Sequence, residues 1–181
     1  LTIVAKETEY FIPQMETKIM NEGWATYWHY KILYELFERK ELPQGIFMEF
    51  IVRHNQVIKP IIGGINPYYL GFELYKNIFE KSEKEKNGTG KDKIFHARES
   101  CRDTSFLRQY LTEEFMAEMN MLSFKKQKDK DEVVVQNISD EEGWKQVREM
   151  VLKNVGLSAV PVIQIEDANF RENQILYLTH N

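Results

Sequence analysis

The sequence predicts an α+β protein that is mainly α-helical, and two observations lead to this fold class. Over residues 1–118 apolar side chains recur mostly at three- and four-residue steps, as they do on amphipathic helices. Over residues 119–181 short apolar runs alternate with polar turns in the order strand, strand, helix, strand, strand. We therefore expect a helical region over residues 1–118, with a small α+β module over residues 119–181 packed on it.

The first two predicted helices carry aromatic residues on their apolar faces. One covers Pro13 to Lys40, with Trp24 and Trp28 on its apolar face and Pro13 in its first turn. The other covers residues 46–58 and places His54 on its apolar stripe. At such a position we favour a partly buried, hydrogen-bonded histidine over a metal ligand.

The third helix has the clearest start signal, because Asn66 is a good N-cap and Pro67 suits the first helical position. It should end near residues 87–88, in a charged surface segment. A fourth helix is expected over residues 94–111, and Thr112 can cap a short fifth helix.

The C-terminal module begins with a predicted hairpin. Its strands are residues 122–124 and 133–135, and its charged tip is KKQKDKDE, residues 125–132. Acidic residues interrupt the lysines of this tip, so we favour a solvated turn over a nucleic-acid contact.

An amphipathic helix and a second pair of strands complete the module. Ser139 starts a capping-box pattern before the helix, which runs through Trp144 to Leu152. The two further strands are expected at residues 160–165 and 174–178, joined by a polar turn.

Composition excludes several classes of protein. The 181 residues are 43% hydrophobic, which is enough to build a core, and their formal net charge of −4 argues against nucleic-acid binding. No apolar run approaches the roughly 18 residues that a membrane-spanning helix needs. The lone Cys101 fits a reducing compartment, so we expect an intracellular protein. Because the chain does not begin with Met, we also expect it to be part of a longer protein.

Glu22 and His29 are the candidate metal ligands, because both side chain types bind zinc and both lie on one face of the first predicted helix. Seven residues of helix separate their Cα atoms by about 10 Å, which is too far for the pair alone to hold one ion. The HExxH pattern of zinc hydrolases is absent, so further ligands would have to come from elsewhere. The alternative is a buried polar pair that is hydrogen-bonded to neighbouring helices.

The fourth predicted helix contains the other polar candidates. Arg98, Arg102, Asp103 and Arg108 are spaced to form an ion-pair ladder, for which a structural role is favoured over an anion site. Cys101 is expected to fill space in the core, because no pattern of a thiol enzyme accompanies it.

Three motifs in order resemble the stage V sporulation protein R (SpoVR-like) family. They are TKIMNEGWATYWH (residues 17–29), GINPYYLGFELYKNIFE (residues 64–80) and KIFHARESCRDTSFLRQYLTEEF (residues 93–115). The resemblance covers essentially the whole chain and places it in the C-terminal part of a longer family member. It implies a role in spore cortex assembly in the mother-cell cytoplasm, and it supplies no catalytic residues. Relatives also occur in bacteria that do not sporulate, so sporulation would be one use of a broader activity.

Two functions follow as hypotheses. The first is a SpoVR-like sporulation protein that acts through protein partners, without catalysis or a cofactor in this chain. The alternative is a zincin-like metal-dependent hydrolase, because residues 21–25 (NEGWA) look like the helical stretch from which one class of zinc peptidases supplies a glutamate ligand. In that case Glu22 would bind zinc together with residues upstream of this chain. The sequence leaves the oligomeric state open.

Overall fold

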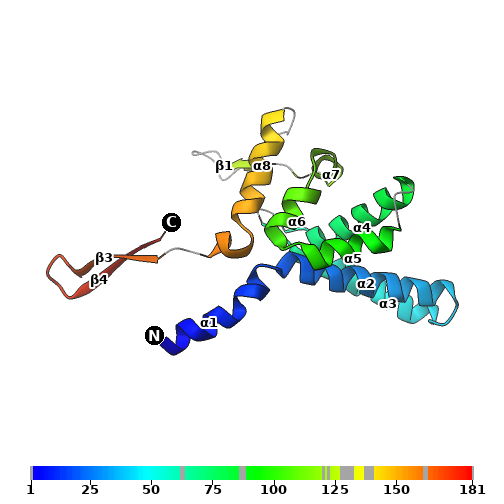
Figure 1. Cartoon of the computed structure of the whole chain (residues 1–181), viewed down its shortest axis with the longest axis horizontal. Helices are drawn as coiled ribbons and strands as arrows, with labels where there is room; N and C mark the ends of the chain where they lie inside the picture. Colours follow the sequence, from blue (N-terminus) through cyan, green and yellow to red (C-terminus); the bar gives the residue numbers. More distant parts are fainter. Residues whose placement is uncertain are drawn as a thin grey trace.

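The computed structural model describes residues 2–61, 64–85, 89–119, 121, 123–126, 133–136, 141–160 and 163–180, and it is mainly helical (Figure 1). The mainly helical fold predicted from the sequence is therefore confirmed. The helices are α1 (Thr2–Met15), α2 (Lys18–Glu38), α3 (Gln44–Val57), α4 (Pro67–Glu85), α5 (Gly90–Ser100), α6 (Asp103–Tyr110), α7 (Glu113–Glu118), α8 (Glu141–Lys153) and the 3₁₀ helix η1 (Gly156–Ala159). The strands are β1 (Ser123–Lys126), β2 (Val133–Gln136), β3 (Ile163–Phe170) and β4 (Ile175–His180).

The centre of the fold is the crossing of α2 and α4, where two glycines bring the backbones into contact. A Cβ atom built on Gly23 would lie 2.3 Å from the Cα atom of Gly71, and one on Gly71 would lie 2.3 Å from the carbonyl oxygen of Ile19. No other residue type fits at this crossing without moving the helices apart. The side chains buried around it include Met20, Leu74, Tyr75, Ile94, Phe106, Leu107, Leu111, Phe115 and Met116.

The predicted single helix from Pro13 to Lys40 is wrong in its first part, because the chain forms two helices there. The first, α1, ends at Met15 and buries none of its residues, whereas α2 begins at Lys18. The new start is stabilised by a distant side chain. The Asp103 carboxylate accepts hydrogen bonds from the backbone N–H groups of Ile19 and Met20, both at 2.9 Å.

The predicted helix over residues 94–111 is also two helices, because the chain breaks at Cys101 and Arg102. The backbone N–H of Asp103 donates to the carbonyl oxygen of Glu16 at 2.8 Å, which turns the chain toward the start of α2. The first of the two helices, α5, begins earlier than predicted, at Gly90. Its N-cap is Thr89, whose hydroxyl oxygen accepts from the N–H of Asp92.

Two helix starts are confirmed with their predicted caps. The Asn66 side-chain oxygen accepts from the N–H of Tyr68 at 3.0 Å, and α4 begins at Pro67. Thr112 caps α7 by accepting from the N–H of Phe115 at 3.3 Å. The predicted end of the third helix at residues 87–88 and the capping residue Ser139 lie outside the described residues.

The strands form two separate antiparallel hairpins rather than one sheet. In the first, Phe124 is opposite Val135. The first two residues of its predicted charged tip, residues 125–132, belong to β1 instead, and residues 127–132 lie outside the described residues. In the second, the C-terminal hairpin, Ile165 is opposite Leu178, and the turn is shorter than predicted because β3 continues to Phe170.

Helix α8 joins the helical core, whereas the C-terminal hairpin does not. Val147, Val151 and Val155 on and after α8 are buried in the same apolar cluster as α2 and α4. The residues of β3 are exposed up to Asn169, and the hairpin extends away from the helices on the same side as α1 (Figure 1). Among the residues that the structure describes, no helix has both the length and the apolar character needed to cross a bilayer.

Candidate functional site

Glu22 lies on α2 next to the Gly23–Gly71 crossing and is half-buried. Its carboxylate accepts a hydrogen bond from the hydroxyl of Tyr68 on α4. This bond, together with the negative charge of Glu22, raises the pKa of Tyr68. The hydroxyl of Thr26 also donates to the backbone carbonyl of Glu22 at 2.6 Å. Glu22 is therefore part of the contact between α2 and α4, as the alternative of a structural polar group predicts.

His29 lies two turns further along α2 and is exposed, so the expectation of a buried Glu22–His29 pair is wrong for the histidine. Its ring packs edge-on against Phe50 of α3, with ring centroids 5.1 Å apart. The two candidate ligands are on one continuous helix, which keeps their Cα atoms about 10 Å apart. The described part of the chain contains no group of three or more His, Cys, Asp or Glu side chains that could hold a metal ion. A metal role for Glu22 and His29 therefore stays a prediction.

His54 is buried, as its place on the apolar stripe predicts, but its hydrogen bonding differs from the expectation. Its ring packs among Tyr30, Phe50 and Phe72, with ring centroids 5.1–5.5 Å away. The buried Nε2 atom has no hydrogen-bond partner among the described residues. Burial lowers the pKa of His54, and the nearby charge of His29 lowers it further. The folded protein therefore favours the neutral form of this imidazole.

Asp103 joins the start of α6 to the start of α2 and is only 1% exposed. Burial raises the pKa of its carboxyl group. The backbone N–H groups of Ile19, Met20 and Lys18 and the charge of Arg98 oppose this shift. Because both carboxylate oxygens already accept hydrogen bonds from α2, this side chain serves as a helix cap rather than as a general base.

The residues of the predicted ion-pair ladder do not lie on one helix, because α5 ends at Ser100 and α6 begins at Asp103. The prediction of a ladder along a single helix is therefore wrong. Its arginines instead connect different helices. Arg102 pairs with Glu16 at 2.7 Å, and Arg98 donates to the side-chain oxygen of Asn21 at 2.7 Å. Cys101, between them, packs against the main core and is half-buried, which agrees with its predicted role as a filler. This junction is therefore structural.

The aromatic residues of α2 form a cluster rather than an open site. Trp24 contacts Trp28, Tyr75 and Phe95 edge-on, with ring centroids 4.9–5.6 Å apart. Burial raises the pKa of Tyr75, so its hydroxyl stays protonated at neutral pH. Trp28 is half-buried at the edge of the same cluster. These rings therefore provide packing between α2, α4 and α5.

Comparison with known proteins assigns this helical core to a family. The sequence model described as "SpoVR like protein" matches residues 1–160. The chain belongs to the SpoVR-like family.

A curated relative supports the same assignment. "Uncharacterized protein YcgB" of Escherichia coli (strain K12) is 31% identical over 202 residues, an alignment that covers 100% of this chain and 40% of the relative. The chain thus spans less than half the length of that relative. No solved structure matches it.

The three motifs that carry the family resemblance correspond to particular contacts in the fold. The first forms the start of α2 with Gly23, the second forms α4 with Gly71, and the third runs from α5 to α7 and contains Asp103. The α2–α4 crossing and the cap of α2 therefore both lie within the motifs. Packing accounts for Gly23 and Gly71, and capping accounts for Asp103.

Proposed function

We propose that this chain is the part of a SpoVR-like protein that binds other proteins during spore cortex formation in the cytoplasm. Membership of the SpoVR-like family supports the link to sporulation.

The exposed apolar surface of the C-terminal hairpin is the observation that carries this proposal. Ile165 and Leu178 are opposite each other in the register, and Ile163 and Leu176 lie on the same face by strand alternation. These four side chains are 47–69% exposed. A contiguous apolar patch on an exposed hairpin is typical of a protein-binding surface, and the strand edges offer unpaired backbone groups.

The test uses the full-length protein in a spore-forming host that needs its own family member to make cortex. The variant Ile165→Glu/Leu178→Glu places two charges on the apolar face, and we expect loss of cortex peptidoglycan and of spore heat resistance. The control is Gln164→Glu/Gln174→Glu, which adds the same two charges at exposed positions outside this apolar pair and should leave both properties unchanged. Thermal unfolding of the purified variants separates loss of binding from loss of folding. Normal cortex in the apolar-face variant would refute the proposal.

The zincin-like hydrolase receives no support from the described residues, and its test is separate. We expect the full-length protein to contain no zinc that depends on Glu22. Metal analysis of Glu22→Ala, with the exposed Glu35→Ala on the same helix as control, checks this. Stoichiometric zinc that is lost only in Glu22→Ala would establish the hydrolase instead, and His29→Ala would then show whether His29 is a second ligand.

A further inference from the structure

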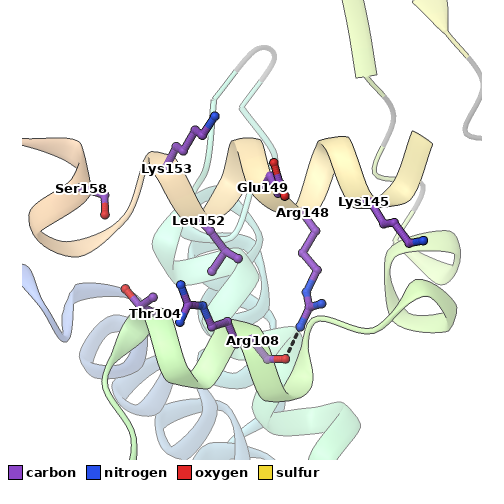
Figure 2. Close-up of a pocket in the computed structure, with 8 residues that line it drawn as sticks. All are labelled: Thr104, Arg108, Lys145, Arg148, Glu149, Leu152, Lys153 and Ser158. Atoms are coloured by element: carbon purple, nitrogen blue, oxygen red, sulfur yellow. Dashed lines mark hydrogen bonds between the residues drawn. The ribbon is translucent and has the colours of Figure 1, made fainter. Parts of the chain in front are cut away.

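A groove of about 610 Å³ lies between α6 and α8, and the start of η1 closes one end of it (Figure 2). Its size is within the range of small-molecule sites in proteins. It is separate from Glu22 and His29, and also from the C-terminal hairpin. The groove is lined by Thr104, Arg108, Lys145, Arg148, Glu149, Leu152, Lys153 and Ser158.

Positive charge dominates the lining of this groove. Four cationic side chains, Arg108, Lys145, Arg148 and Lys153, line it beside a single carboxylate, Glu149. None of these cations makes a salt bridge to the side chains that the structure describes. In a chain with a net charge of −4, such a concentration of positive charge favours an anionic ligand.

The two arginines contact each other through the backbone of Arg108, while the Arg108 side chain extends away from Arg148 (Figure 2). Arg148 donates a hydrogen bond to the backbone carbonyl of Arg108, and its guanidinium carbon lies 5.8 Å from the centre of the Trp144 ring. These contacts hold Arg148 in position and use only part of the hydrogen-bonding capacity of its guanidinium group, which has five N–H donors. Its Nε atom is buried and has no partner among the described residues. The Arg108 side chain is exposed and extends below Leu152 toward Thr104 (Figure 2).

This arrangement indicates which anion would bind. Guanidinium groups bind phosphate oxygens through two parallel hydrogen bonds, so two neighbouring arginines match two linked phosphates. The hydroxyl groups of Thr104 and Ser158 can donate further hydrogen bonds at the end near η1. The carboxylate of Glu149 repels a long anionic ligand that extends along α8. The groove therefore favours a compact anion over a polyanion. We propose that the groove between α6 and α8 binds a small molecule that carries a diphosphate group.

The test measures the binding of inorganic pyrophosphate to the full-length protein by isothermal titration calorimetry. We expect saturable binding with one site per chain, weakened at least about tenfold by Arg108→Gln and by Arg148→Lys, because each change removes a bidentate contact. The matched control is Arg53→Gln, since Arg53 lies on α3 and pairs with Glu49 at 2.8 Å. This control should bind pyrophosphate like the wild type.

The outcomes separate this site from a general effect of charge. Absence of saturable binding, or equal weakening in Arg53→Gln, would overturn the proposal. So would a single-stranded oligonucleotide that binds more tightly than pyrophosphate through the same arginines, because the ligand would then be a nucleic acid. Binding of a nucleoside diphosphate distinguishes two kinds of ligand that both fit the proposal. An affinity equal to that for pyrophosphate indicates that the groove recognises the diphosphate alone. A higher affinity indicates that the groove also contacts an organic group attached to the diphosphate. Because Arg108 is exposed, its variant decides the test even if Arg148→Lys unfolds.

Discussion

At the scale of single residues, Asp103 has the largest structural effect that the fold reveals. Its carboxylate caps α2 by accepting from the backbone N–H of Ile19, which lies 84 residues earlier in the chain. Asn at this position can accept through one side-chain atom only, and its amide group would face a backbone N–H. We therefore expect Asp103→Asn to lower the free energy of unfolding by about 2 kcal/mol or more. Urea denaturation measures this, and the exposed Glu99→Gln on α5 should change it by less than about 0.5 kcal/mol.

His54 makes the stability of the fold depend on pH. Because burial lowers its pKa in the folded state, the unfolded chain binds the proton more readily. This histidine therefore stabilises the fold less and less as the pH falls below its ordinary pKa of 6.5. We expect His54→Leu to reduce the fall in thermal midpoint between pH 7 and pH 5. The exposed His96→Leu should leave the slope of the wild type unchanged, and equal slopes in all three proteins would contradict this role for His54.

At the scale of elements, the crossing of α2 and α4 depends on the absence of side chains at two positions. A methyl group on Gly71 would meet the Ile19 carbonyl oxygen and the Gly23 Cα atom at 2.3 and 2.6 Å, and backbone atoms cannot rotate away as a side chain can. We expect Gly71→Ala to destabilise the fold by about 1–3 kcal/mol. Gly45→Ala on α3 is the matched control, because nothing lies within 4 Å of its added methyl group. It should be neutral or stabilise the fold by up to about 1 kcal/mol, and chemical denaturation compares the two.

The sequence predicts those helix ends that depend on local residues. Asn66 and Thr112 cap helices within their own segments, so the residue types alone reveal the starts of α4 and α7. The start of α2 and the break after α5 depend on Asp103, whose partners are more than 80 residues away, and no local pattern contains that information. The groove between α6 and α8 could not be predicted from the sequence for the same reason. Its cations are scattered from Arg108 to Lys153 and meet only because α8 packs beside α6.

At the scale of the whole molecule, the buried core and the proposed binding surface are in different parts of the chain. The core extends from Ile19 to Val155, while the C-terminal hairpin keeps its apolar side chains exposed. The predicted division into residues 1–118 and 119–181 stays a prediction, although α8 contributes buried residues to the main core. The chain covers 40% of the curated relative, so most of the length of that relative has no counterpart in this chain.

The separation of core and hairpin leads to a prediction about the whole chain. If the hairpin contributes little to the core, a chain that ends at Val160 should unfold at nearly the same temperature as the 181-residue chain, as followed by circular dichroism at 222 nm. The physical reason is that deleting exposed strands removes little apolar surface that folding buries. A chain that ends at Lys145 instead loses Val147, Val151 and Val155 and should unfold at a clearly lower temperature. An equal loss in both truncated chains would mean that the hairpin is part of the cooperative fold, and its exposed face would then need an explanation other than protein binding.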